Sequence, residues 1–394
     1  MKRSIFFIVL IVSMFVANAQ KNTPMRAYNL FYEKDYVKAK ECIDQCVLDE
    51  KFASKASTWL YKANIDYRLA SDEYSKKQAD TSYQIQYVTT PEEAYHAFKK
   101  AEELNKNVEA TDMLSPFEAL PRIYPILFIE GINYLVKNDF QRSKEVLALA
   151  VESYEMKTPE YPLNGELYYY YAYTLEMLKD DANARKYYQK SIEDGSTNMS
   201  VVLRLIESYK KSDSKDKVLE LIHSAKAKNQ TNVDILVAEA DYYYWIGDKN
   251  QGRQLLDKVS ASISNSSDAL VNAANLYIKD ESYLQAEEML KKAYRQYPDN
   301  AAIVHNLGVC CSNIGEAKYA EANKLSIEGK QTESNSVKQS ADRYMEDAAN
   351  YFEKSLKNDP NDINLMQKLK EIYLRLSHDD KAKAMEERIA KIQK

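Results

Sequence analysis

Small and apolar residues recur along most of the chain at steps of three and four, the spacing that places residues on one face of an α-helix. The segment 269–300 shows the pattern clearly. It predicts a first helix around the small residue Ala274, and a short polar turn at 280–282 follows. The second predicted helix carries a stripe at Ala286, Leu290 and Ala293. We expect the two helices to pack against each other through their small residues, which allow a close approach.

The same pattern repeats in fixed phase. The residue at the Ala274 position of the first helix, here named the pivot, recurs at intervals of 34 residues, at Ala172, Ile206, Ala240, Ala274 and Gly308. The second-helix stripes keep this phase, at Ala184/Tyr188/Ser191, Val218/Ile222/Ala225, Gly252/Leu256/Val259 and Ala286/Leu290/Ala293. A period of this length predicts a stack of helix pairs, since a single pair cannot bury both of its apolar faces.

Elsewhere the pattern is interrupted. We expect about eight units in all, followed by a polar C-terminal helix pair that caps the stack, with insertions near residues 71–90, 107–122 and 316–343. The last insertion is helical in pattern on both sides of a polar segment at 328–336, which predicts an extended helical hairpin.

These spacings resemble those of the tetratricopeptide repeat (TPR), a helix-turn-helix unit of 34 residues. The resemblance covers residues 20–394 and, with the N-terminus described below, is to TPR proteins of the exported bacterial type. It implies an all-α fold, a right-handed α-solenoid of TPR helix pairs with helical insertions. It also implies binding of protein or peptide partners in place of catalysis.

In TPR proteins the first helix of each unit lines the inner surface, with the residues three before and one, four and five after the pivot facing inward. Carried onto this sequence, the resemblance implies partner-binding residues at Phe128, Tyr169, Tyr173, Asp241, Tyr244, Trp245, Asn275 and His305. A packing role between units is the alternative for many of the 32 tyrosines. The lysines with which some TPR domains hold a peptide carboxylate are replaced by Leu60 and Val271, so that ligand class is disfavoured.

The N-terminus predicts export. Lys2 and Arg3 precede an apolar run from Ile5 to Val16, and small residues end at Ala19, so we expect signal-peptide cleavage between Ala19 and Gln20. The run is shorter than the roughly 18 residues that span a bilayer. We therefore expect a periplasmic or secreted protein without an integral membrane segment after cleavage.

Composition narrows the function further. The chain has only 8 glycines and 9 prolines among 394 residues, which disfavours turn-rich β and α/β folds. Its formal net charge of −5, with acidic and basic residues interleaved, disfavours nucleic acid as a partner. The four cysteines, Cys42, Cys46, Cys310 and Cys311, lie too close together within each pair for structural disulfides, so we expect buried thiols.

No pattern of catalytic or metal-binding residues is present in the sequence. The four histidines are scattered, and there is no HExxH, CxxC, EF-hand or phosphate-binding glycine motif. We therefore expect no catalytic residues, metal or cofactor, and interpret the chain as a non-catalytic interaction scaffold of the cell envelope or secreted space. The alternatives are an accessory subunit of an envelope or glycan-processing enzyme complex, an unrecognised enzyme site around His305, Cys310 and Cys311, and a homo-oligomer formed through the insertion at 316–343.

Overall fold

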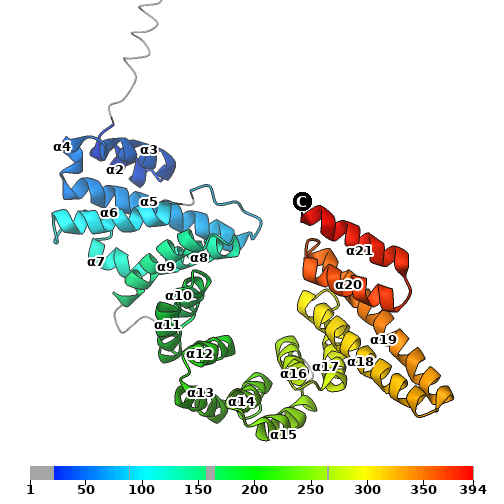
Figure 1. The fold of residues 1–394 in the computed structure, drawn as a ribbon. Coiled ribbons are helices and arrows are strands. Elements are labelled where there is room, and N and C mark those ends of the chain that lie inside the picture. Colours follow the sequence, from blue (N-terminus) through cyan, green and yellow to red (C-terminus); the bar gives the residue numbers. More distant parts are fainter. Residues whose placement is uncertain (1–21, 88, 157–164, 264–265, 394) are drawn as a thin grey trace, which may run out of the picture. The chain divides into compact units, whose positions relative to one another are not determined.

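The computed structural model describes residues 22–87, 89–156, 165–263 and 266–393, and this part of the chain contains helices and no strands. The all-α prediction is therefore confirmed. The chain divides into two compact units, residues 1–208 and 209–394, which are described separately (Figure 1). The predicted array at 20–394 thus falls into two parts, and the predicted cleavage site at Ala19 and Gln20 lies outside the described residues.

The first unit is a layered series of antiparallel helix pairs, shown from blue to green in Figure 1. Its helices are α2 (Pro24–Tyr32), α3 (Tyr36–Cys46), α4 (Glu50–Ala53), α5 (Ala56–Ala79), α6 (Thr90–Leu104), α7 (Pro116–Ala119), the 3-10 helix η1 (Leu120–Arg122), α8 (Tyr124–Val136), α9 (Phe140–Glu155), α10 (Gly165–Met177) and α11 (Asp181–Glu193). Helix α12 (Met199–Lys211) contains the boundary between the units.

The second unit continues with helix pairs of the same kind. Its helices are α13 (Lys215–Lys228), α14 (Val233–Trp245), α15 (Lys249–Ser260), α16 (Ser267–Lys279), α17 (Tyr283–Gln296), α18 (Ala301–Ile327), α19 (Gln331–Asn358), α20 (Ile363–Arg375) and α21 (Asp379–Ile392). The α18–α19 pair, drawn in yellow and orange in Figure 1, is much longer than its neighbours.

The pivots and second-helix stripes form the core, as the spacing predicts. All five pivots of the regular array are buried, and so is every member of the four stripes listed above. Gly308 shows why the pivot is small, because an added Cβ would lie 2.5 Å from the ring of Phe352 on the second helix. Gly131 meets Leu147 at the same distance. Any larger residue would push the paired helices apart.

The turns inside the helix pairs share a backbone conformation that the sequence pattern does not reveal. Lys179, Asp213, Gly247 and Glu281, at intervals of 34 residues, have φ angles of 65°, 52°, 91° and 55°. After Lys179, Asp213 and Glu281, the amide of the following residue bonds back to the first helix, as in Ser282 N to Tyr277 O at 2.8 Å. This is the left-handed helix ending that glycine adopts most easily, yet only one of the four residues is glycine.

The three insertions take different forms. Residues 71–79 extend α5, and residues 107–122 contain α7 and η1. Residues 316–343 belong to the long α18–α19 hairpin, whose turn is confined to 328–330, shorter than the polar segment at 328–336 from which it was predicted. In the α18–α19 hairpin, the helical periodicity therefore predicts the extent of the helices better than the polarity of the segment does.

Candidate functional site

Two of the three aromatic residues expected on the inner surface of the first unit, Tyr169 and Tyr173, lie together on α10. Tyr169 and Tyr173 stack with their ring centroids 6.5 Å apart and an interplanar angle of 17°. The guanidinium of Arg204 lies 4.4 Å from the centroid of the Tyr173 ring. Phe128 on α8 is half-buried and contacts the neighbouring Tyr170 at 5.8 Å. Stacking and a cation–π contact thus hold the α10 rings in place before any partner binds.

Hydrogen bonds extend this ordered surface. Arg204 Nη1 donates to both carboxylate oxygens of Glu176 at 3.1 Å, and the Tyr188 hydroxyl donates to Glu176 Oε2 at 2.6 Å. Beside this polar network, two apolar side chains five residues after their pivots remain open to solvent, Val136 at 76% and Met177 at 38%. We call Tyr169, Tyr173 and Met177, with Phe128 and Val136 on α8, the aromatic face of the first unit.

The residues expected on α14 of the second unit have other roles as well. Asp241 forms an ion pair with Lys210 and lies 3.7 Å from Lys279, so its charge is neutralised within the chain. Tyr244 packs beside Gly252, where an added Cβ would lie 2.9 Å from the tyrosine ring. Trp245 is half-buried, and its ring centroid lies 6.1 Å from that of Tyr242. Tyr244 therefore contributes mainly to packing, the alternative that the sequence left open.

Asn275 and His305 lie on the two following first helices. Asn275 accepts a hydrogen bond from Asn306 Nδ2 at 2.8 Å, which ties α16 to α18. His305 is half-buried, with its ring centroid 5.8 Å from that of Phe352. Of the eight residues expected on the inner surface, His305 is one that lines a pocket.

This pocket, here named the α18–α20 pocket, has a volume of about 230 Å³. Helix α18 contributes the four residues that lie three before and one, four and five after the pivot Gly308, namely His305, Val309, Ser312 and Asn313. The remaining lining comes from Phe352 on α19 and from Asp362, Asn364, Leu365 and Lys368 at or near the start of α20. The inward rule thus identifies all four α18 residues, although only His305 was selected from the sequence.

A second pocket, of about 540 Å³, lies in the first unit and was not anticipated from the sequence. Its lining comes from Trp59 and Lys62 on α5, from Arg142 on α9, and from residues of α6 and its N-cap. The residues on α6 or at its N-cap are Thr89, Glu92, Glu93, His96, Ala97 and Lys100. These residues do not occupy the inward positions of their helices, so no rule based on the pivots could have found them.

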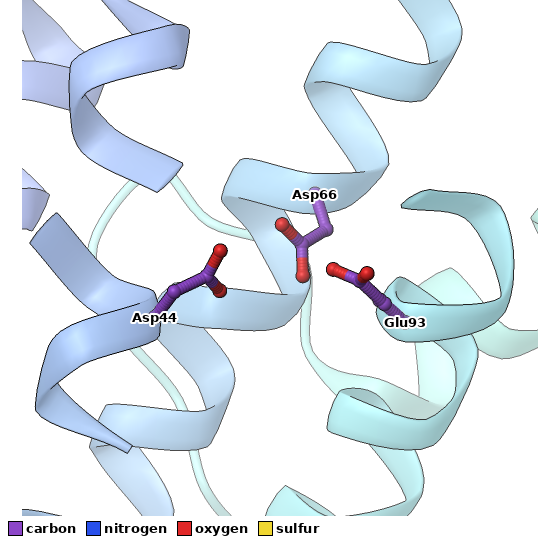
Figure 2. Close-up of side chains that lie close together, drawn as sticks. All are labelled: Asp44, Asp66 and Glu93. Carbon is purple, nitrogen blue, oxygen red and sulfur yellow. The ribbon is translucent and has the colours of Figure 1, made fainter. Parts of the chain in front are cut away.

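One wall of this second pocket belongs to a cluster of charged residues. Asp44 on α3, Asp66 on α5 and Glu93 on α6 point toward one another (Figure 2). Lys62 Nζ lies 2.5 Å from Asp44, 2.8 Å from Asp66 and 3.4 Å from Glu93, and Lys40 Nζ contacts the same three carboxylates. The cluster therefore joins three helices through two ammonium groups.

This arrangement disfavours a metal ion among the three carboxylates. Burial raises the pKa of Asp66 to about 6, against the opposing effects of Lys62 and Lys40. For Lys40, burial alone would lower the pKa, but Asp66, Glu93 and Asp44 outweigh it and raise the pKa. A divalent cation would have to displace two ammonium groups whose charges already compensate most of the cluster. We interpret the cluster as a structural ion-pair network.

A second carboxyl of the first unit has an unusual environment. Glu130 on α8 is fully buried, and neither of its oxygens accepts a hydrogen bond from a donor group in the described part of the chain. Burial, followed by the nearby charge of Glu92, raises the pKa of Glu130 to about 9, against the effect of Arg142. At neutral pH the side chain is therefore an uncharged acid close to Glu92, which in turn pairs with Arg142.

The cysteines next to His305 do not supply a nucleophile. Cys310 and Cys311 are 0% and 1% exposed, and burial raises the pKa of Cys310 to about 12. Such a thiol carries almost no thiolate at neutral pH. All four cysteines are buried with free thiols, as the sequence predicted.

None of the helices in the described part of the chain is both long and apolar enough to span a bilayer.

Residues 130–198 match the family model described as tetratricopeptide repeat. This segment contains the second half of α8 and all of α9, α10 and α11, apart from the residues that the structure does not describe. The match shows tetratricopeptide repeats in this segment, and the buried pivots show that helix pairs of the same pattern continue after it. Such repeats are typically non-catalytic and support protein–protein interaction. Among curated proteins, no sequence matches this chain.

Several solved structures resemble the chain in part. The human IFIT1 dimer with m7Gppp-AAAA is 18% identical, with 83% of this chain and 68% of that chain covered and a TM-score of 0.41. YrrB, described as a TPR protein with an unusual peptide-binding site, is 19% identical, with 54% and 97% covered and a TM-score of 0.31. MamA is 15% identical, with 48% and 94% covered and a TM-score of 0.34. At these scores we infer nothing from them about the function of this chain.

Proposed function

We propose that this protein is an exported, non-catalytic scaffold that binds protein or peptide partners through the inner faces of its first helices. The observation that carries the proposal is the α18–α20 pocket. Its α18 wall consists of the four residues that the repeat geometry directs inward, and its opposite wall includes residues of the next first helix, α20. A recess between successive first helices is suited to side chains of an extended partner.

The aromatic face of the first unit supports the same function by a separate argument. Aromatic side chains provide a large contact area at low cost in conformational entropy, and they dominate many protein interfaces. Tyr169 and Tyr173 are already fixed by stacking and by Arg204, so less ordering is required on binding. The exposed ends of Val136 and Met177 add apolar contact area beside them.

Export is the part of the proposal that rests on the sequence alone. The basic residues Lys2 and Arg3, the apolar run to Val16 and the small residues up to Ala19 support it. Protein partners are favoured over nucleic acid because the chain is acidic overall, and binding to phosphates requires a surplus of basic groups.

The proposal can be tested by affinity purification of the full chain from envelope and secreted fractions, followed by mass spectrometry. Wild type is compared with a Tyr169→Ala/Tyr173→Ala variant and with Val309→Phe, which narrows the α18–α20 pocket. A matched control is Glu103→Gln, an exposed change on α6 at a residue that belongs to neither surface. We expect the control to retain its partners and at least one of the other variants to lose them.

Equal recovery of all partners by all variants would refute binding through these faces. Recovery of an envelope enzyme in a stoichiometric complex would refine the role to that of an accessory subunit. Processing and location are checked separately, by N-terminal sequencing of the mature chain, where a start other than Gln20 would contradict the predicted cleavage.

A further inference from the structure

Part of the segment between α6 and α7, residues 107–115 and here named the strap, is bound to the first helices of the first two repeat units. Ala27 on α2 and Ala63 on α5 occupy the pivot positions of these units, and both are 0% exposed. The inward rule selects the residues one and five after a pivot, and thus Asn64 on α5 and Tyr32 on α2. Both of these side chains bind the strap.

Asn64 holds one residue of the strap by its main chain. Its Nδ2 donates to the carbonyl oxygen of Leu114 at 3.0 Å, and its Oδ1 accepts a hydrogen bond from the amide of Leu114 at 2.8 Å. Nδ2 also donates to the carbonyl of Leu60 on its own helix, and the Asn64 side chain is buried. The two bonds to the strap use only main-chain groups, which every residue except proline possesses.

Tyr32 forms the second attachment. Its hydroxyl donates to the carbonyl oxygen of Thr111 at 2.8 Å and lies 3.2 Å from Asp112 Oδ2. The ring centroid of Tyr28 lies 4.8 Å from that of Tyr32 and 5.0 Å from that of Tyr61 on α5. The main chain of the strap therefore crosses from α2 to α5 beside a row of aromatic rings.

The strap itself buries little of its surface. Glu109, Thr111 and Asp112 are exposed, and Val108 is the one buried residue between positions 107 and 115, all of which the structure describes. Asp112 has a φ angle of 53°, in the left-handed region that a side chain disfavours. Little apolar contact therefore opposes release of the strap, and a strained residue favours it.

We propose that the inner face of α2 and α5 is a binding site for an extended segment of a partner protein, and that the strap occupies this site until the partner displaces it. The partner is recognised through its main chain, with the N–H and C=O of one residue paired to Asn64 and a carbonyl paired to Tyr32. This inference rests on the proposed peptide-binding function, but its surface shares no residue with the aromatic face or the α18–α20 pocket.

The strap is tethered at both ends, so it competes with a partner at a high effective concentration. A peptide added in solution should therefore bind weakly to wild type and more tightly once the strap is released. Leu114→Pro releases the strap because it removes the N–H that donates to Asn64. The matched control Leu114→Ala shortens the side chain but keeps both main-chain bonds.

The probe is a fluorescent peptide with the sequence of residues 107–115 and blocked ends, titrated against each full-length variant. We expect Leu114→Pro to bind it at least about tenfold more tightly than wild type, and Leu114→Ala to stay within about twofold of wild type. Adding Asn64→Ala to Leu114→Pro should weaken binding about tenfold. Methylation of the peptide nitrogen that corresponds to Leu114 should weaken binding to Leu114→Pro by a similar factor.

Equal affinity of wild type and Leu114→Pro for the peptide would overturn the inference, as would binding that survives Asn64→Ala. Tight binding to Leu114→Ala would show that the leucine side chain holds the strap, and would overturn recognition through the main chain. None of these results would affect the scaffold function, which is tested by substitutions on the aromatic face and in the α18–α20 pocket.

Circular dichroism shows whether Leu114→Pro keeps its helices. If it does not, the comparison is made with wild type that carries a protease site between Lys106 and Asn107, two exposed residues, and is cut after folding. Cleavage there frees one end of the strap and lowers its effective concentration, so the peptide should bind more tightly after the cut. An unchanged affinity would overturn the inference.

Discussion

The buried acid Glu130 gives a sharp prediction about the pH dependence of stability. It lies among Tyr74 on α5, Glu92 and Glu93 on α6, and Arg142 on α9. The substitution Glu130→Gln keeps the shape of the side chain and replaces its O–H group with an uncharged amide. It removes the only proton that the side chain can lose.

The sign follows from the two states of the chain. In the unfolded chain Glu130 titrates near its ordinary pKa of 4.5, and in the folded chain near 9. Folding between these values requires uptake of a proton, so the contribution of Glu130 to stability is greatest below pH 4.5, falls as the pH rises, and levels off above 9. Each pH unit in this window changes the free energy of unfolding by about 1.4 kcal/mol.

Glu130→Gln has no such dependence at this position. From pH 5 to pH 8 its free energy of unfolding should therefore rise relative to wild type by about 4 kcal/mol. An N–H of the new amide that finds no acceptor would add a cost of about 1–3 kcal/mol that is independent of pH. The slope against pH is therefore the decisive quantity, and the difference at any single pH is not.

Urea unfolding followed by circular dichroism at several pH values measures this slope, with the transition of the first unit fitted separately from that of the second. Glu103→Gln, an exposed change on α6, controls for the loss of a carboxylate as such and should keep the wild-type slope. Parallel stability curves for wild type and Glu130→Gln from pH 5 to pH 8 would refute the assignment of Glu130 as a protonated acid.

Three further changes test other parts of the structure. Glu281→Gly should raise the free energy of unfolding by about 0.5–1 kcal/mol in a denaturant titration, because glycine tolerates the positive φ at this position. Gly247→Ala should lower the free energy of unfolding for the same reason. An unchanged free energy in both variants would argue against strained turns. Ala286→Arg places a charge in a fully buried contact and should unfold the adjoining helix pairs, seen as lost helical circular dichroism; an unchanged spectrum and melting curve would contradict the repeat register. Lys62→Met should destabilise the first unit by about 3 kcal/mol at pH 7, because it leaves the buried carboxylate of Asp66 without this ion-pair partner. At pH 4, where Asp66 is protonated, the loss of stability should be smaller. An equal loss of stability at both pH values would mean that the ion pair with Asp66 is not the cause.

The sequence was sufficient for the helices and for their register. A stripe at steps of three and four depends only on helix geometry, so Ala286, Leu290 and Ala293 could be assigned to one buried face without knowledge of their neighbours. The inward rule of the TPR resemblance also leads directly to Val309, Ser312 and Asn313, three residues of the α18–α20 pocket that were not selected from the sequence.

The tertiary structure decided what each inward or charged residue does. Tyr169 and Tyr244 occupy related positions in the repeat, yet one stacks on the aromatic face and the other packs beside Gly252. The protonation of Glu130 and the pairing of Asn64 with the main chain of Leu114 likewise depend on groups brought in from other parts of the chain. Periodicity records which face of a helix is buried, but burial, charge and hydrogen bonding are set by partners distant along the chain, and only packing brings those partners together.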